Sequence, residues 1–260
     1  MSGARGLGAA LLLLLGGLAL LGPSLLPDPA LQDLRSALQP PGTTWWLGTD
    51  HLGRSVLARA AHALRFSLTL AATAVGIAVL LGTGLGLLAA SLGGLADRAL
   101  AALGDATLAL PGLLLVMVVV AFAPGEILPL SGGVALAQWV HFFRVARAEA
   151  RRVLALPHAE AARVLGFGPD YVLRRLVLPE LRPILLTLVG FGLGTAVLQV
   201  AALSFVGVGV RPPTPELGSM TTELLPYLPE APVQALVPAV LVAMLVLGFQ
   251  LLSADEGQKP

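Results

Sequence analysis

Hydrophobic and polar residues alternate in long blocks along this chain. A helix must offer about 20 apolar residues to cross the hydrocarbon core of a bilayer, which is about 30 Å thick. Six apolar runs are near or above that length, although Pro111 lies in the third, and Pro129, Gln138 and His141 interrupt the fourth. They occupy residues 7–26, 66–92, 103–122, 127–143, 184–206 and 233–252. The pattern predicts an all-α, polytopic membrane protein of about six transmembrane helices.

The first apolar run, which Arg5 precedes, has two interpretations. A secretory signal peptide has an apolar core of about 7 to 15 residues, followed by a small-residue cleavage site. The run from Leu7 to Leu26 is longer, and no clear A-x-A site follows it. We therefore expect residues 1–26 to form an N-terminal tail and an uncleaved first transmembrane helix.

A polar segment, residues 27–65, separates the first two runs. It opens with prolines and contains Trp45 and Trp46, a residue type that favours the membrane interface. Its second half is predicted to be an amphipathic helix on the membrane surface, capped by Thr49 or Asp50. Asp50 and Arg54 would form a pair within this helix. The apolar face would hold Leu52, Val56, Leu57, Ala60 and Leu64, opposite Arg54, Arg59, His62 and Arg65.

Glycines are dense in the second apolar run. Small side chains let neighbouring transmembrane helices approach closely, so dense packing is expected there. The glycines concerned are Gly76, Gly82, Gly84 and Gly86, and a short link containing Gly93, Gly94, Asp97 and Arg98 follows.

Basic residues gather in one loop, residues 144–183. Arginine is retained on the cytoplasmic side of a membrane, so this loop is predicted to be cytoplasmic. Six spans then place both termini on the same side and residues 27–65 outside. The remainder, residues 66–260, forms a five-helix core that carries the loop. Its eight arginines are Arg144, Arg147, Arg151, Arg152, Arg163, Arg174, Arg175 and Arg182.

Composition agrees with a membrane protein and excludes several functions. Hydrophobic residues make up 56% of the 260 residues and charged residues only 12%, against about a quarter charged in soluble domains. A formal charge of +1 gives no reason to expect nucleic acid as a partner. The absence of cysteine excludes thiolate chemistry. No metal site is expected, because His51, His62, His141 and His158 lack ligand spacing.

Within the basic loop, residues 157–179 are predicted to fold as helix, turn and helix, which we call the elbow. Pro157 can open the first helix, Glu160 suits the positive end of its dipole, and Gly166, Gly168 and Pro169 would end it. Asp170 can cap the second helix, which would stop near Pro179. The elbow is either a mere connection or a docking projection for another protein. Docking is favoured because a connection needs far fewer ordered residues.

The elbow resembles the E-A-A-x3-G-x9-[I/L]-x-L-P signature of membrane permeases in bacterial ABC importers. The residues that match are Glu160, Ala161, Ala162 and Gly166 in the first half, and Leu176, Leu178 and Pro179 in the second. The resemblance implies the type I ABC importer permease fold. It also implies that this segment is the coupling helix, which inserts into a cleft of an ATPase subunit and passes its closure to the membrane spans.

Two further stretches are similar to the C-type subunits of dipeptide, oligopeptide and nickel importers. One is LGTDHLGRSVLAR, residues 47–59, which contains Gly48, Thr49, Asp50, Gly53 and Arg54. The other is ALSFVGVGVRPPTPELG, residues 202–218. This sequence departs from the group's pattern at Ser55, Ala58 and the Glu216–Leu217 pair, and in its SADEGQKP tail. A contact of Asp50 and Arg54 with a binding protein or a partner permease is the alternative to a pair within one helix.

The resemblance implies a machine in which this chain has no catalytic role. Its partners would be a second permease, identical or different, two ATP-binding subunits and an extracytoplasmic substrate-binding protein, all at the bacterial cytoplasmic (inner) membrane. ATP and Mg²⁺ would bind to the ATPase subunits, so this chain itself would hold no cofactor; it carries no G-x-x-x-x-G-K-[ST] phosphate loop. The implied cargo is a small solute, most commonly a dipeptide or oligopeptide, with nickel or metal chelates as the alternative.

Polar residues inside the apolar runs are candidates for a translocation path, because lipid tolerates them poorly. They are Gln138 and His141 in the fourth run, and Gln199 and Ser204 in the fifth. Each can equally hold two helices together. The rivals from other classes are a secondary transporter that needs no ATPase and a membrane enzyme. The apolar runs contain no clear charged residue of the kind an ion-coupled carrier uses.

Overall fold

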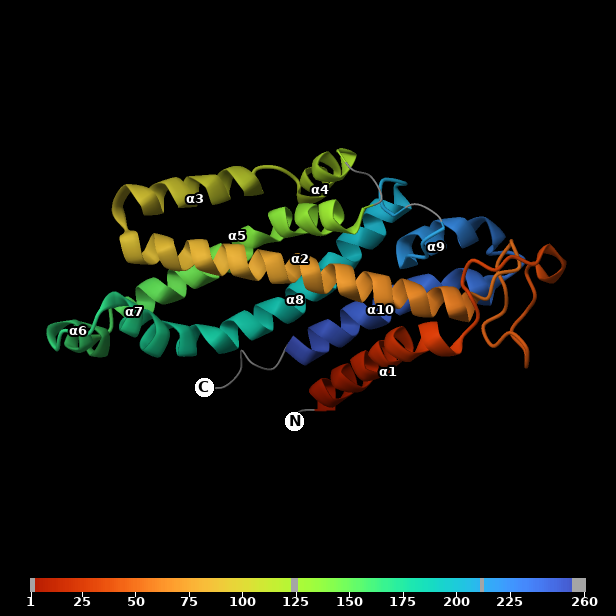
Figure 1. Cartoon of the computed structure of the whole chain (residues 1–260), viewed down its shortest axis with the longest axis horizontal. Coiled ribbons are helices and arrows are strands. Elements are labelled where there is room, and N and C mark those ends of the chain that lie inside the picture. The colour runs from red at the N-terminus through yellow and green to blue at the C-terminus, as the bar shows by residue number, and fades with distance from the viewer. Residues whose placement is uncertain (1–2, 123–125, 211–212, 254–260) are drawn as a thin grey trace.

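The computed structural model describes residues 3–122, 126–210 and 213–253, and within them it contains helices and no strand. Figure 1 shows long helices lying along one axis. The long helices are α1 (Gly3–Leu25), α2 (Val56–Leu92), α3 (Gly94–Leu108), α4 (Gly112–Ala121), α5 (Ile127–Leu154), α8 (Leu178–Phe205) and α10 (Pro232–Ser253). The short elements are α6 (Pro157–Val164), α7 (Pro169–Val172), a π-helical turn (Leu173–Val177), α9 (Leu217–Leu224), and 3₁₀ turns at Leu34–Ser36 and Leu225–Tyr227.

The two ends of the bundle differ in structure (Figure 1). One, which we call the elbow end, carries α6 and α7. The other, the loop end, carries residues 26–55 and α9. Helices α1 and α10 pack side by side in opposite directions. The start of α1 and the end of α10 therefore lie on the side of the bundle that faces the elbow end, where Arg5 Nε donates to the carbonyl of Leu252 at 3.4 Å.

Four of the described helical segments are long and apolar enough to cross a membrane: α1, α2, the continuous helix 169–205, and α10. A fifth arises if α3 and α4 are counted as one broken span. The fourth predicted span, residues 127–143, forms part of α5 and falls short on composition rather than length. The 28 residues of α5 span about 42 Å at the helical rise, but they include Gln138, His141 and a polar arginine-rich end.

The third predicted span is not one straight helix. Its residues divide between α3 and α4, whose axes meet at 88°. Proline has no backbone N–H and disfavours a helical conformation in the residue before it, so a helix reaching Leu110 and Pro111 is interrupted. Pro111 is the N-cap of α4. The region predicted as the third span, residues 103–122, is therefore broken at Pro111 and is not one continuous helix.

The prediction of a separate surface helix before the second span is also wrong. Helix α2 is continuous for 37 residues, and the Oγ of Ser55 caps it by accepting from the N–H of Ala58 at 3.3 Å. Thr49 and Asp50 precede the helix and do not cap it. Val56, Ala60 and Leu64 are buried as expected, but Arg59, placed on the polar face by periodicity, is only 2% exposed.

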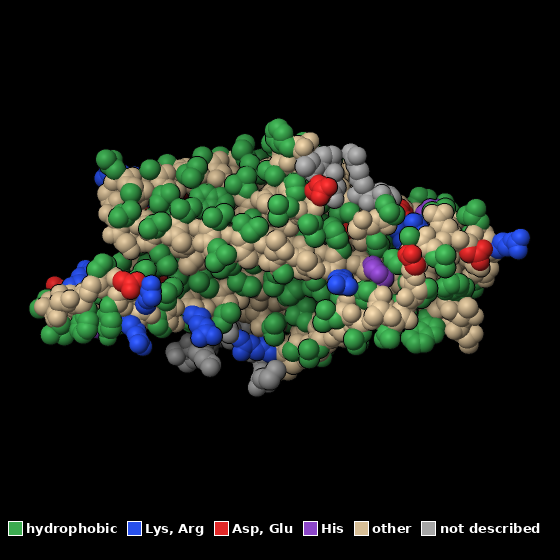
Figure 2. All heavy atoms as spheres, viewed as in Figure 1, with side chains coloured by type: hydrophobic (Ala, Val, Ile, Leu, Met, Phe, Trp, Pro, Cys, Tyr) green, Lys and Arg blue, Asp and Glu red, His purple; other side chains and the backbone are tan. Residues whose placement is uncertain are grey.

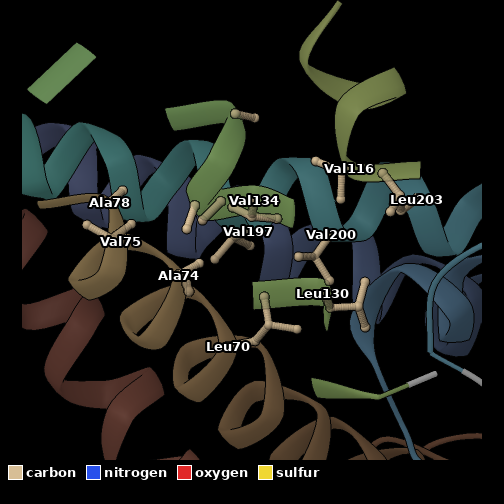
Figure 3. Close-up of a cluster of buried hydrophobic side chains, with 14 of the residues drawn as sticks. Leu70, Ala74, Val75, Ala78, Val116, Leu130, Val134, Val197, Val200 and Leu203 are labelled. Carbon is tan, nitrogen blue, oxygen red and sulfur yellow. The ribbon is translucent and has the colours of Figure 1, made fainter. Parts of the chain in front are cut away.

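The core joins α2, α4, α5 and α8 through branched and small apolar side chains (Figure 3). Gly82 and Gly86 of α2 lie against the α5 backbone near Phe143, where a Cβ would clash. Gly76 and Gly84 face open space, so only two of the four expected glycines mediate this contact. The labelled core residues are Leu70, Ala74, Val75, Ala78, Val116, Leu130, Val134, Val197, Val200 and Leu203.

The face of the bundle shown in Figure 2 is largely hydrophobic along its length, and most of its charged side chains lie toward the two ends and along the lower edge. Leucines such as Leu13, Leu80 and Leu92 are exposed. A soluble protein would rarely expose so much contiguous apolar surface. Because all long segments are helical, their backbone polar groups are satisfied internally, as the bilayer interior requires.

Candidate functional site

The first limb of the elbow, α6, begins and ends as its sequence predicts. Pro157 occupies the first turn, where its missing N–H costs no hydrogen bond, and Glu160 also lies in that turn. Gly166 follows the C-cap with a φ of +86°, a left-handed conformation that glycine adopts without strain. The N–H of Phe167 donates to the carbonyl of Ala162, and that of Gly166 to Arg163, both at 3.0 Å. These two bonds form a Schellman motif that terminates the helix.

The two faces of α6 differ. Ala159 and Ala162 are buried with Val172 of α7, and small side chains here let the two limbs fold against each other. Glu160 and Ala161 point to the outside. Beside them Val164 and Leu165 are 82% and 75% exposed, although both are apolar. The elbow therefore presents an exposed apolar tip with one carboxylate on a short, well-terminated helix.

The second limb differs from its prediction in two ways. Gly168, not Asp170, is the N-cap of α7, and Asp170 lies in the first turn. The helix also does not stop at Pro179. The chain passes from α7 through the π-helical turn directly into α8, and the N–H of Leu178 donates five residues back to the carbonyl of Leu173. This wider turn accommodates Pro179, which cannot donate a hydrogen bond. Leu176 is half-buried, and Leu178 and Pro179 are exposed.

Ion pairs fix the base of the elbow to the bundle. Arg152 at the end of α5 binds Glu149 on its own helix, with Nη2 2.6 Å from Oε1, and also Glu180 of α8. Asp97 of α3 pairs with Arg147 and Arg151 of α5, each at 2.5 Å. Both stems of the elbow are therefore tied to their neighbours. Sequence reasoning identified the arginines as topological signals but missed these pairings.

A polar groove of about 230 Å³ lies between α5 and α8. Gln138, His141 and Gln199, three of the four predicted path residues, line it together with Thr195. The Nε2 of Gln138 donates to the Oε1 of Gln199 at 3.3 Å. None of the described lining residues is an acid, a lysine or an arginine. The fourth candidate, Ser204, is buried away from this groove.

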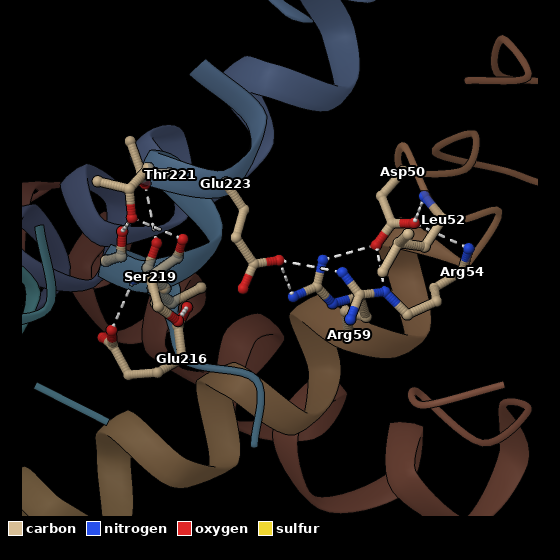
Figure 4. A network of polar contacts seen from close by, with 11 residues as sticks. Asp50, Leu52, Arg54, Arg59, Glu216, Ser219, Thr221 and Glu223 are labelled. Atoms are coloured by element: carbon tan, nitrogen blue, oxygen red, sulfur yellow. Dashed lines mark hydrogen bonds and ion pairs between the residues drawn. The ribbon is translucent and has the colours of Figure 1, made fainter. Parts of the chain in front are cut away.

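At the loop end, the GTD–GR stretch builds a buried charge network (Figure 4). Gly48 and Gly53 both have a φ of +75°, which turns the chain back on itself. Asp50 Oδ2 accepts from Arg54 Nε and from Arg59 Nη1, each at 2.6 Å. Both arginines also donate to Oε2 of Glu223 in α9, at 3.0 and 2.6 Å. The pair predicted between Asp50 and Arg54 exists, but outside the helix and as half of a four-residue network.

The electrostatics of Asp50 follow from this geometry. Burial alone would raise the pKa of its carboxyl, yet the N–H of Arg54 and the guanidinium groups of Arg59 and Arg54 outweigh burial and lower that pKa. Glu223 belongs to the network without any sequence signal, because 164 residues separate it from Arg59. Two acids and two arginines sum to zero charge, which is what allows them to be buried together.

Glu216, one of the departures from the family pattern, has a local role. It is the buried N-cap of α9, and its Oε2 accepts from the N–H of Ser219 at 2.9 Å. Its carboxylate therefore caps the helix as a serine hydroxyl would at that position. Arg211 and Pro212 of the same stretch lie outside the described residues, as does the chain after Ser253. Among the residues described, no cluster of acids and histidines has metal-ligand geometry.

A helical bundle with apolar sides, an exposed elbow and a polar groove defines a membrane transport subunit. The family model described as "Binding-protein-dependent transport system inner membrane component" matches residues 82–254. The dipeptide transport system permease protein DppC of Haemophilus influenzae is 30% identical, over 95% of this chain and 86% of its own. The glutathione transport system permease protein GsiD of Pectobacterium atrosepticum is 33% identical, over 82% and 70%.

The chain belongs to this family of inner membrane permease components, and the resemblance deduced from its elbow signature is confirmed. A di/tripeptide transport system permease protein DppC of Pseudomonas aeruginosa is also similar, at 33% identity over 94% of this chain and 83% of its own. Among solved structures, an inward-facing MetNI methionine ABC transporter matches with a TM-score of 0.58 and 20% identity. That match covers 71% of this chain and 88% of the other, and it supports the ABC transporter permease fold.

Proposed function

We propose that this chain forms one half of the membrane path of an ATP-driven importer for dipeptides or oligopeptides. The observation that carries the proposal is the elbow: an exposed, terminated helix whose two stems are tied to the bundle by ion pairs. A segment built this way moves as one body with α5 and α8. A push on its tip is thereby transmitted to the helices that border the polar groove.

The elbow is the docking point for a separate ATPase in this proposal. Two ATPase subunits close when they bind ATP and reopen after hydrolysis, and the free energy enters as differential binding of ATP to the two states. Closure displaces the elbow tip around Glu160 and tilts the helices, so that access to the path alternates between the two sides of the membrane. This chain supplies no catalytic group and binds neither ATP nor Mg²⁺.

The polar groove is the proposed wall of the path, completed by a second permease. Its amide side chains, Gln138 and Gln199, can donate and accept hydrogen bonds as a peptide backbone does. Uncharged lining also holds cargo weakly enough to release it. Relatives named for dipeptide and glutathione transport favour peptides over nickel or metal chelates. A substrate-binding protein delivers the cargo at the loop end.

The elbow assignment is tested by reversing its charge. Glu160→Lys places a positive charge on the docking tip, and Gly166→Pro forbids the left-handed turn that ends α6. Both variants are expected to stay in the membrane, lose co-purification of the ATPase and reduce uptake of a labelled dipeptide by at least about tenfold. Glu230→Lys makes the same charge change at the loop end and should leave co-purification intact. Normal uptake by Glu160→Lys would remove the coupling role.

A secondary transporter is the alternative from another class. If the chain is a secondary transporter, uptake continues after the phosphate-loop lysine of the partner ATPase is substituted. Uptake then stops when the ion gradient across the membrane is collapsed. The importer predicts the reverse. Uptake measured under both conditions separates the two, independently of any variant of this chain.

A further inference from the structure

A second groove, of about 520 Å³, runs between α8 and α10 beside the start of α1. Its described lining changes character along its length. Arg5, Thr187 and Ser253 contribute polar groups at its elbow-facing end. Leu193 of α8 and Phe249 of α10 lie further toward the loop end and make it apolar. A cavity that is polar at one end and apolar along the rest matches a lipid, which has a polar headgroup and apolar acyl chains.

One arginine near the polar end of this groove, Arg182, has no carboxylate partner among the described residues. Most arginines of the basic loop are balanced by a carboxylate, as Arg147 is by Asp97 and Arg174 by Asp170. Arg182 itself is exposed. It precedes Leu186, a lining residue, by one helical turn, so both share a face of α8. Figure 2 shows blue side chains along this lower edge of the molecule.

We propose that this groove binds an anionic phospholipid. The phosphate lies near Arg182, and one acyl chain follows Leu186, Leu193 and Phe249. Basic pockets between transmembrane helices on the cytoplasmic side recognise anionic headgroups, which fits the predicted orientation of the elbow end. The volume suits an acyl chain and is too small for a partner helix, which would need about 20 residues to cross the same depth.

The absence of cysteine makes the site directly testable in the full-length chain. Leu193→Cys gives a single attachment point for a fluorophore inside the apolar part of the groove. The labelled protein is placed in nanodiscs of phosphatidylcholine containing increasing fractions of brominated phosphatidylglycerol or, separately, brominated phosphatidylcholine. Bromine quenches only nearby fluorophores, so quenching reports which lipid occupies the groove.

Brominated phosphatidylglycerol is expected to reach half-maximal quenching at a mole fraction roughly fivefold lower than brominated phosphatidylcholine, the effect of about one basic residue. Arg182→Gln should abolish that preference. Arg98→Gln, which removes another exposed arginine at the start of α3, should keep it.

Equal quenching by the two lipids would overturn the proposal, because the groove would then only contact bulk lipid. The same preference in Arg182→Gln would also overturn it. Absence of quenching by either lipid would show that protein, such as a partner permease, fills the groove instead. None of these outcomes depends on the ATPase, so they leave the proposed coupling role of the elbow unaffected.

Discussion

Arg59 shows how far a single side chain can depart from the pattern around it. Helical periodicity places it on a polar face, yet it is buried between Asp50 and Glu223. An arginine can be buried when its planar group meets two carboxylates. The same contacts fix residues 49–55 and α9 to the start of α2. The network thus orders the loop end, where a substrate-binding protein would arrive.

Removing one member of this network should be costly. Arg59→Met keeps the length of the side chain but leaves Asp50 with one guanidinium partner fewer in a buried site. We expect a loss of roughly 3–5 kcal/mol, the usual effect of breaking a buried ion pair. Thermal unfolding in detergent, followed by size-exclusion chromatography, measures this loss of stability. Arg65→Met, an exposed site on the same helix, should change stability by less than about 0.5 kcal/mol. Equal losses of stability in Arg59→Met and Arg65→Met would contradict the structural role of the network.

The pH dependence of the network follows from the lowered pKa of Asp50. A carboxyl whose folded pKa lies below its unfolded value, about 3.9, stabilises the fold fully above that value and loses the contribution as pH falls through the folded pKa. Wild-type stability should therefore keep this contribution from pH 7 to about pH 5. The difference in unfolding temperature between wild type and Asp50→Asn should narrow only below about pH 4. A difference that narrows already at pH 6 would contradict the lowered pKa.

At the scale of the element, α2 shows that two glycines of one helix can have different roles in packing. Gly82 and Gly84 are two positions apart and point in different directions. A Cβ on Gly82 would meet the Cβ of Phe142 at 2.7 Å and the backbone nitrogen of Phe143 at 2.9 Å, whereas nothing lies within 4 Å of one on Gly84. The apolar run alone cannot show which glycine faces α5.

Matched alanine substitutions test this difference. Gly82→Ala should lower stability by about 1–3 kcal/mol, because the α5 backbone must move to admit the methyl group. Gly84→Ala should leave stability unchanged or raise it, since alanine favours the helix. Thermal unfolding of the two purified variants compares them directly. Equal losses would show that α2 and α5 do not pack as described.

At the scale of the whole molecule, the elbow end and the loop end lie at opposite ends of the bundle (Figure 1). If the arginine loop is cytoplasmic, a cysteine at Glu160 should react with a membrane-impermeant maleimide only after the cells are permeabilised. A cysteine at Trp46, 73% exposed at the loop end, should react in intact cells. Labelling both positions in intact cells and in permeabilised cells compares the two sides of the membrane. Reaction of the Glu160 position in intact cells would exclude the proposed coupling.

Much of the candidate site is encoded locally. Pro157 and Gly166 define the ends of α6 because a missing N–H and a left-handed φ depend on one residue and its immediate neighbours. Ala162 of the signature and Ala159 beside it fit for the same reason: a short helix can fold back only over small side chains. The continuation of α7 into α8 was not foreseen, because a π-helical turn leaves no distinct sequence pattern before Pro179.

The sequence by itself determined that the chain is helical, that most of it is apolar enough for a membrane, and where the elbow begins. These properties depend on residues within a few turns of one another. Only the tertiary structure decided that Glu223 meets Arg54 and Arg59, that α3 and α4 turn by 88° around Pro111, and that Ser204 lies outside the polar groove. The contact of Glu223 and the place of Ser204 require segments distant in the chain to meet in one relative orientation, which packing of whole helices fixes and no local pattern contains. Pro111 interrupts the helix locally, but the angle between α3 and α4 depends on how each of them packs against α5.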